Sequence, residues 1–242
     1  MGPTRTRPRG RTVVEGRRES RSVDHLGGEG RVIPVPTAET RTAVTDRAGV
    51  IVNYRTGATI VLTGGALDEW LSAVRQGNAP KPVVVTNPGA SWGTHETAAR
   101  LESHGSPPWP WRVAALACVA LTLTVRQTGR SEYRFGRLVR LASVGGALPP
   151  ASAVHARTAV RSVRWAARAI PARVACLEES TAASVLLAAG GRGNAWRHGV
   201  AADPIRLHAW ICDEHGRPVE EPGHTGDYTP INTANSSGAE PR

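Results

Sequence analysis

A proline-rich stretch divides the chain into two parts with different residue patterns. Residues 78–111 contain six prolines, in the strings KPVVVTNPGASWG and SPPWPW among others, a composition typical of linkers. Before this stretch, short runs of β-branched residues alternate with turn-like breaks, and after it the apolar residues recur at helical spacing. We therefore predict an α+β protein with two folded units, joined by a linker that includes a short helix at Glu96–Ser103.

Residues 31–77 predict a small β-meander closed by a helix. Three runs rich in Val, Ile and Thr are expected to be strands, at Thr42–Thr45, Val50–Tyr54 and Thr59–Leu62. The strings DRAG and RTG between them are turn-like. The helix is expected at Ala66–Val74, where apolar residues recur every three or four positions.

Positive charge is unevenly distributed along the chain. The formal net charge is +10, and nearly all the positive charge is arginine because Lys81 is the only lysine. Residues 100–173 contain twelve Arg and two Glu, whereas residues 174–242 are net acidic. Residues 1–30 are Arg-rich and poor in apolar residues, and they are predicted to be disordered, as are residues 232–242. A nucleic-acid-binding face would be more uniform, so no nucleic-acid partner is predicted; a steep salt dependence of DNA affinity would revive that alternative.

Residues 112–231 are predicted to form the larger unit, and its first part is helical. Helices are expected at Val113–Gln127, Tyr133–Ala142 and Ala153–Ala169. The longest apolar run, residues 113–125, is shorter than the roughly 20 residues that a membrane span needs, so no span is predicted. The three cysteines are an odd number, which favours reduced thiols and a cytoplasmic location.

The third of these helices carries a row of arginines. They are Arg157, Arg161, Arg164 and Arg168. Their spacing places them on one face of the helix, beside an apolar face of Ala, Val and Trp. The usual meaning of such a row is a solvated surface, and docking of an acidic partner is the alternative.

The C-terminal third contains the residues that indicate chemistry. After Pro171 a new helix is expected to begin at or beside Cys176 and to stop at Gly190-Gly191. Backbone N–H groups at a helix N-terminus stabilise a thiolate, so Cys176 is a candidate nucleophile. The commoner role of a lone cysteine, a small buried apolar residue, is the alternative.

Two strands follow, at Ala195–Ala201 and Ile205–Cys212, and the second contains His208. A helix-start Cys, a strand His and a following acid, Glu220 or Glu221, are the types needed for a nucleophile, its base and the group that orients the base.

Three alternative interpretations of this part of the chain remain: a zinc site, Cys212 as the nucleophile, and a non-catalytic adaptor. A zinc site would use His208, Cys212, His215 and His224, although their spacing lacks the short paired ligands of structural zinc sites. Cys212 as the nucleophile is disfavoured because it lies within a strand, away from a helix end. A non-catalytic peptide-binding adaptor is the third, and selective alkylation of one thiol would argue against it.

Several strings in order, CLEES, HGV, LHAWI and HGRPVEEP, closely resemble the leader-peptidase half of the B protein of lasso-peptide maturation. Those enzymes belong to the transglutaminase-like, papain-related superfamily, and the resemblance covers about residues 110–231. A weaker resemblance covers about residues 32–77. There, VTDRAGVIVNYRTGATIVLTGGALDEWL is similar to the small, winged-helix-like PqqD-like domain that recognises leader peptides in the same system.

The resemblance implies a cysteine protease that removes the leader from a ribosomally made precursor. Its implied partners are the leader peptide and a separate ATP-dependent, asparagine-synthetase-like cyclase, with no cofactor and no metal. By residue, Cys176 matches the nucleophile and His208 the general base. The family's third residue is an Asp, where this chain has Glu221 with Glu220 beside it. A transglutaminase-like acyl transfer uses the same residues and stays open.

The resemblance also implies how a leader would bind. Related recognition domains take the peptide as an added strand on their third strand, here about Ala58–Leu62. Tyr54, Ile60 and Leu62 are the implied leader-binding residues, and burial of Tyr54 and Ile60 in the core is the alternative.

Overall fold

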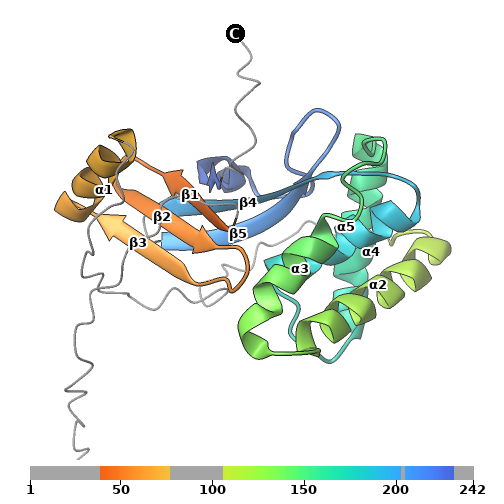
Figure 1. Ribbon diagram of the computed structural model, residues 1–242. Helices are drawn as coiled ribbons and strands as arrows, with labels where there is room; N and C mark the ends of the chain where they lie inside the picture. The colour runs from red at the N-terminus through yellow and green to blue at the C-terminus, as the bar shows by residue number, and fades with distance from the viewer. Residues whose placement is uncertain (1–38, 77–105, 203–204, 232–242) are drawn as a thin grey trace, which may run out of the picture.

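The computed structural model describes residues 39–76, 106–202 and 205–231 (Figure 1). It is a mixed α+β structure with two three-stranded antiparallel sheets. The two ends that are predicted to be disordered, most of the predicted linker and the helix expected at Glu96–Ser103 lie outside the described residues. Within the described part of the chain, no helix is both long and apolar enough to cross a membrane.

The N-terminal sheet has the predicted meander topology. Its strands, in the order β1-β2-β3, are β1 (Thr40–Val44), β2 (Ala48–Asn53) and β3 (Thr59–Thr63), and helix α1 (Gly65–Arg75) follows. The four predicted elements are all present, with ends that differ by two residues or fewer. Turn side chains support the register, since Asn53 Oδ1 accepts hydrogen bonds from the backbone N–H groups of Arg55 and Thr56.

Four helices and a short 3₁₀ turn come next. They are α2 (Trp109–Gln127), η1 (Ser131–Tyr133), α3 (Arg134–Ala142), α4 (Ala153–Ala169) and α5 (Cys176–Ala189). Helix α2 begins four residues before its predicted start, because Pro110 falls in its first turn, where a missing N–H costs nothing. Helix α4 ends at Ala169, since Ile170 takes an extended conformation before Pro171.

The C-terminal sheet has the order β5-β4-β6. Strands β4 (Ala195–Ala202) and β5 (Ile205–Cys212) match the predicted pair, with β4 one residue longer. The 3₁₀ turn η2 (Gly223–Asp227) and the two-residue strand β6 (Thr229–Pro230) are not predicted from the sequence.

Two apolar cores hold the C-terminal part together and join it to the N-terminal sheet. The first core lies between α2, α4, α5 and β5, and Val119, Val163 and Leu187 are fully buried in it. In the second core, Val50 and Val52 of the N-terminal sheet belong to one cluster with residues of β4, β5 and α3. The N-terminal sheet therefore packs against the C-terminal part of the molecule, while α1 covers its other face.

Helix α3 contacts the turn between β2 and β3 at very short range. A Cβ on Gly136 would lie 2.5 Å from the carbonyl oxygen of Arg55, so only glycine permits this approach. The N-terminal sheet is therefore fixed to the helical region at this turn as well as through the shared core.

Candidate active site

Cys176 is the first residue of helix α5. Ala175 before it is extended, and the Glu178 carboxylate accepts a hydrogen bond from the Ala175 backbone N–H at 3.1 Å. Arg126 of α2 contacts that carboxylate at 3.2 Å, which ties the start of α5 to α2. The thiol of Cys176 is thus held where the positive end of the helix dipole and the unpaired N–H groups of the first turn stabilise negative charge.

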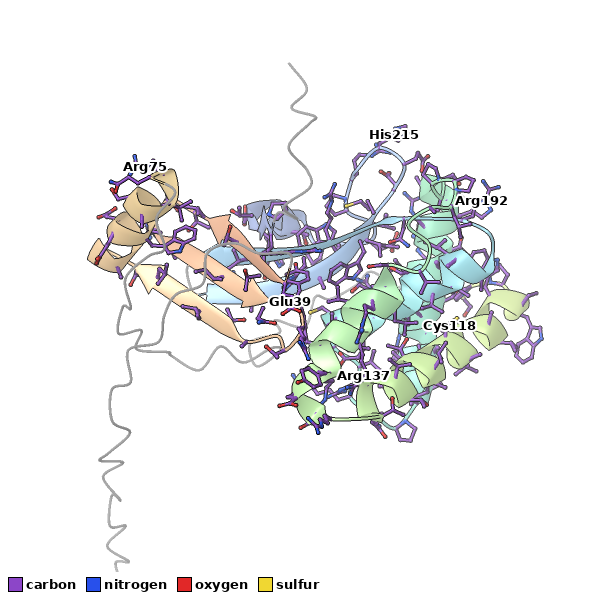
Figure 2. The ribbon with its side chains drawn as sticks, viewed as in Figure 1. Glu39, Arg75, Cys118, Arg137, Arg192 and His215 are labelled. Carbon is purple, nitrogen blue, oxygen red and sulfur yellow. The ribbon has the colours of Figure 1, made fainter. Side chains whose placement is uncertain are left out.

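Of the three cysteines, Cys176 is the most exposed. Its side chain is partly exposed, whereas Cys118 and Cys212 are buried. Cys118 lies on α2 among the helices (Figure 2). Burial raises the pKa values of the Cys118 and Cys212 thiols, which keeps them in the unreactive protonated form.

His208 of β5 lies between a carboxylate and the thiol. Its Nε2 atom is 2.7 Å from Oε2 of Glu221, and a side-chain hydrogen bond links the ring to Cys176. Burial lowers the pKa of His208, but the hydrogen bonds and negative charges of Cys176 and Glu221 outweigh it and raise the pKa to about 10.

Aromatic rings fix the plane of the His208 imidazole. The Trp210 ring stacks on it with a centroid separation of 5.7 Å, and the Tyr228 ring lies 5.3 Å away. Gly199, the cross-strand neighbour of His208, leaves room for Trp210, because a Cβ there would lie 2.7 Å from the indole ring. The imidazole is therefore held edge-on to the acid and the thiol.

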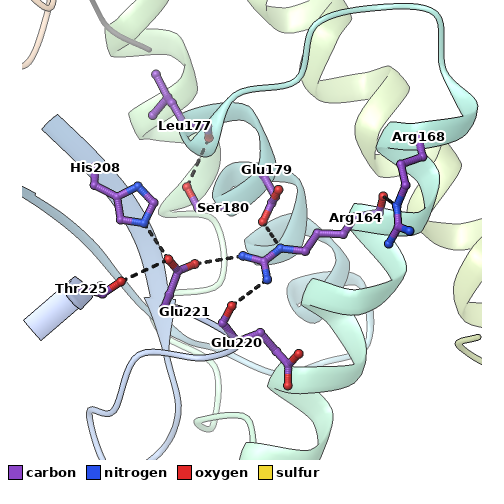
Figure 3. A network of polar contacts seen from close by, with 9 residues as sticks. All are labelled: Arg164, Arg168, Leu177, Glu179, Ser180, His208, Glu220, Glu221 and Thr225. Carbon is purple, nitrogen blue, oxygen red and sulfur yellow. Dashed lines mark hydrogen bonds and ion pairs between the residues drawn. The ribbon is translucent and has the colours of Figure 1, made fainter. Parts of the chain in front are cut away.

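The two adjacent acids, Glu220 and Glu221, have different contacts. Glu221 faces His208, and Thr225 also approaches its carboxylate (Figure 3). Glu220 points instead to helix α4, where its Oε1 lies 3.2 Å from Arg157 and 3.1 Å from Arg161. The geometry thus places Glu221, and not Glu220, against the imidazole of His208.

The arginine row of α4 is only partly solvated. Arg168 is exposed, but the Arg164 side chain is 12% exposed and contacts Glu179, Glu221 and the backbone of Glu220 (Figure 3). The prediction of a solvated face is therefore wrong for Arg164. The acidic groups that the row binds belong to the same chain.

His198 is a buried histidine that sequence reasoning missed. It lies on β4, on the face opposite His208, and its Nδ1 is 2.9 Å from the Tyr54 hydroxyl. Burial, followed by the nearby charges of His208 and Arg41, lowers the pKa of His198 to about 3. Strand alternation with Trp196 and Val200 marks this position as inward-facing, which was the available signal.

The implied leader-binding residues differ in exposure. Tyr54 and Leu62 are buried, Tyr54 in the core shared with the C-terminal sheet and Leu62 under α1, whereas Ile60 is partly exposed. Burial of Tyr54 and Leu62 favours the core alternative for those two. Strand β3 is an outer strand of its sheet and, within the described residues, pairs with β2 alone.

The described residues contain no group of three or more His, Cys, Asp or Glu side chains placed to hold a metal ion. Of the four candidate zinc ligands, His208 is bonded to Glu221, Cys212 is buried, and His215 lies beside Glu214 in an exposed turn. The geometry of the site therefore fits acid–base and thiol chemistry.

Comparison with known proteins agrees with this geometry. Residues 115–233 match the transglutaminase-like superfamily, a range that contains Cys176, His208 and Glu221. No curated protein and no solved structure matches the chain significantly. Proteins of the transglutaminase-like fold typically use a cysteine for catalysis, as proteases or as acyltransferases. Residues 115–233, just under half of the chain, are therefore similar to the transglutaminase-like superfamily.

Proposed function

We propose that the protein is a cysteine peptidase that uses Cys176 as its nucleophile. The observation that carries the proposal is one continuous set of contacts from the thiol at the start of α5, through the His208 ring, to the buried Glu221 carboxylate. A nucleophile bonded to a base that is itself oriented by an acid is the arrangement that acyl-transfer enzymes need.

The proposed reaction has two steps. His208 takes the proton from the Cys176 thiol, and the sulfur attacks the scissile carbonyl to give a tetrahedral intermediate. His208 returns the proton to the leaving amine as the C–N bond breaks, leaving a thioester. Water, deprotonated by His208, then hydrolyses the thioester to a carboxylate and restores the thiol.

The start of helix α5 is the proposed site for the oxyanion. The backbone N–H of Cys176 lies at the helix end, where the first N–H groups have no acceptor within the helix. It is the donor closest in sequence to the nucleophile and it carries the positive end of the helix dipole.

The proposed substrate is the leader part of a ribosomally made lasso-peptide precursor. The sequence resemblance to leader peptidases supports this choice of substrate. The position of β3 supports it too: among the described residues β3 is an outer strand, and an extended peptide can add to an outer strand through main-chain hydrogen bonds. In this proposal Ile60 is the side chain of β3 that contacts the peptide, and a separate ATP-dependent cyclase receives the cleaved core.

The test is cleavage of the precursor peptide encoded by the short reading frame nearest the gene. Full-length protein and the Cys176→Ala variant are incubated with that synthetic peptide, and the products are identified by mass spectrometry. We expect the wild-type protein to release the leader and the variant to bind the peptide without cutting it. Full cleavage by Cys176→Ala would contradict the proposal.

The same experiment separates peptidase from acyltransferase, the other activity compatible with the superfamily. With a primary amine added, a transferase gives a leader fragment whose mass includes the amine, whereas a peptidase gives the free carboxylate. Binding with no product of either kind would instead indicate a leader-binding adaptor.

A further inference from the structure

One guanidinium group joins the helix that carries Cys176 to the loop that carries Glu221. Arg164 of α4 donates from Nε to Glu179, from Nη1 to the Glu220 carbonyl oxygen at 2.6 Å, and from Nη2 to Glu221 Oε1 at 3.1 Å. Figure 3 shows the side chain reaching across from α4 to all three acceptors. With 12% of its side chain exposed, Arg164 is part of the interior.

Each acceptor is connected to a reacting group. Glu179 lies three residues after Cys176 in α5, so the two share one side of the helix. The Glu221 carboxylate is hydrogen-bonded to Nε2 of His208. Arg164 therefore fixes the start of the nucleophile's helix relative to the carboxylate that orients the base.

We propose that Arg164 is a positioning residue, which sets the geometry of Cys176 and His208 by holding Glu179 and Glu221 together. This inference rests on the proposed function, because it assigns Arg164 a role in the same catalytic site. Arg164 contacts neither reacting atom and acts through the two carboxylates.

The backbone at Glu220 supports this role. Glu220 has φ of +55°, a left-handed backbone conformation that non-glycine residues keep only where their neighbours enforce it. Its carbonyl oxygen is bound by Arg164, and its carboxylate is bound by Arg157 and Arg161. The arginines of α4 thus hold the loop in the conformation that directs the next residue, Glu221, at His208.

Charge compensation is the second part of the role. Glu179 and Glu221 are neighbouring carboxylates; burial raises the pKa of Glu179, and Arg164 opposes that rise. His208 of β5 also acts on Glu179, and Tyr228 is close enough to Glu221 for the carboxylate to add to the rise that burial causes in the pKa of Tyr228. Without the guanidinium, the two carboxylates repel each other and one of them takes up a proton at a higher pH.

A lysine cannot replace this arginine fully. The planar guanidinium donates in three directions at once, whereas an ammonium group on a flexible chain reaches fewer of these acceptors in one geometry. The Arg164→Lys variant should therefore keep part of the charge compensation but lose the alignment. The Arg164→Met variant should lose both.

The test measures alkylation of Cys176 by iodoacetamide in the full-length protein, because this readout needs no substrate. Peptide mapping assigns the label to Cys176, Cys118 or Cys212, and the rate is followed from about pH 5 to pH 9. Near pH 6 we expect the Cys176 rate to fall about tenfold in Arg164→Lys and about a hundredfold in Arg164→Met, the scale expected for misplaced reacting groups. The acid limb of the profile should also move to higher pH.

Arg168→Met is the matched control, since Arg168 is exposed and lies one turn further along the same helix. We expect its alkylation profile to equal that of the wild-type protein. Circular dichroism and thermal unfolding check that each variant is folded. If the Arg164→Met variant does not fold, the Arg164→Lys variant alone tests the inference. Cys176 rates and profiles in a folded Arg164→Lys variant within twofold of wild type would overturn the inference.

Alkylation of the wild-type protein distinguishes failure of the proposed peptidase from failure of the role of Arg164. If wild-type Cys176 is alkylated no faster than the buried Cys118 and Cys212, the site lacks an activated nucleophile, and the proposed peptidase is wrong. If wild-type Cys176 is selectively alkylated and the Arg164 variants match it, only the positioning role fails.

Discussion

The two faces of the C-terminal sheet shift the pKa of a histidine in opposite directions. On the face toward the N-terminal sheet, His198 bonds to the neutral hydroxyl of Tyr54, and burial lowers the pKa of His198 to about 3. On the face toward α5, burial also lowers the pKa of His208, but Cys176 and Glu221 raise it to about 10. Both rings are at least partly buried and lie on adjacent strands, and burial lowers the pKa of both. Anionic partners are what distinguish the candidate catalytic face from the structural face.

Exchanging each histidine for asparagine should give the largest difference between the faces. His208→Asn removes the base, and we expect kcat/KM for leader cleavage to fall by about 10³-fold, within the range for loss of a general base. His198→Asn should lower kcat/KM less than about threefold, because it contacts no reacting group. Cleavage assays on the two folded variants measure this, and equal losses would break the comparison.

Removing the anionic partner should make the catalytic histidine more like its neighbour. We expect Glu221→Gln to lower kcat/KM by about 10²-fold, since the imidazole loses the group that orients it and stabilises its charge. The pKa of His208 should fall, because the largest source of negative charge other than Cys176 is gone. NMR titration of isotope-labelled histidine checks the direction. A pKa that stays near 10 would show that Glu221 is not the controlling acid.

The structural face can be tested at Tyr54. Tyr54→Phe removes the hydroxyl from the buried pair with His198, so we expect the free energy of unfolding to fall by about 1–3 kcal/mol. Urea unfolding followed by fluorescence measures the change. Loss of leader affinity at unchanged stability would instead place Tyr54 in a peptide-binding groove.

The last expected effect is a pair of opposite pH slopes, each at most about 1.4 kcal/mol per pH unit. His198 has a lowered folded-state pKa, so the stability gained by keeping it neutral is present above about pH 6.5 and is lost as pH falls toward about 3. His208 has a raised folded-state pKa, so its contribution is present below about pH 6.5 and is lost as pH rises toward about 10.

Unfolding free energies of His198→Phe and His208→Asn across this range check the prediction. Relative to the wild-type protein, His198→Phe should lose less stability on acidification, and His208→Asn should lose less on alkalinisation. Slopes of the same sign in both variants would mean that the two faces do not differ in the way described.

Much of the secondary structure is encoded locally and follows from the sequence. The α4 bounds agree because Pro171 ends the helix just after its apolar periodicity stops, and α5 begins at Cys176 as predicted. The positions of Cys176 at a helix start and His208 within a strand predict a candidate nucleophile and base. Their spacing does not predict that they meet in space; the family resemblance does.

The features that the sequence did not predict depend on long-range contacts. Arg164 and Glu221 are 57 residues apart, and an arginine row beside an apolar face has the same pattern whether water or a carboxylate faces it. His198 was missed because alternation along β4 marks an inward-facing position but does not show that the N-terminal sheet covers it. The choice between Glu220 and Glu221 likewise depends on the positive φ of Glu220, a backbone state that its residue type disfavours.

The core shared by the two sheets has a consequence for folding cooperativity. Val50 and Val52 are buried against the same cluster as Val200 and Ala209, so neither sheet keeps its apolar face covered without the other. A chain shortened to residues 106–242 would expose that face to water and tend to aggregate. The two halves should therefore melt in a single transition, because each sheet depends on the other to cover its apolar face.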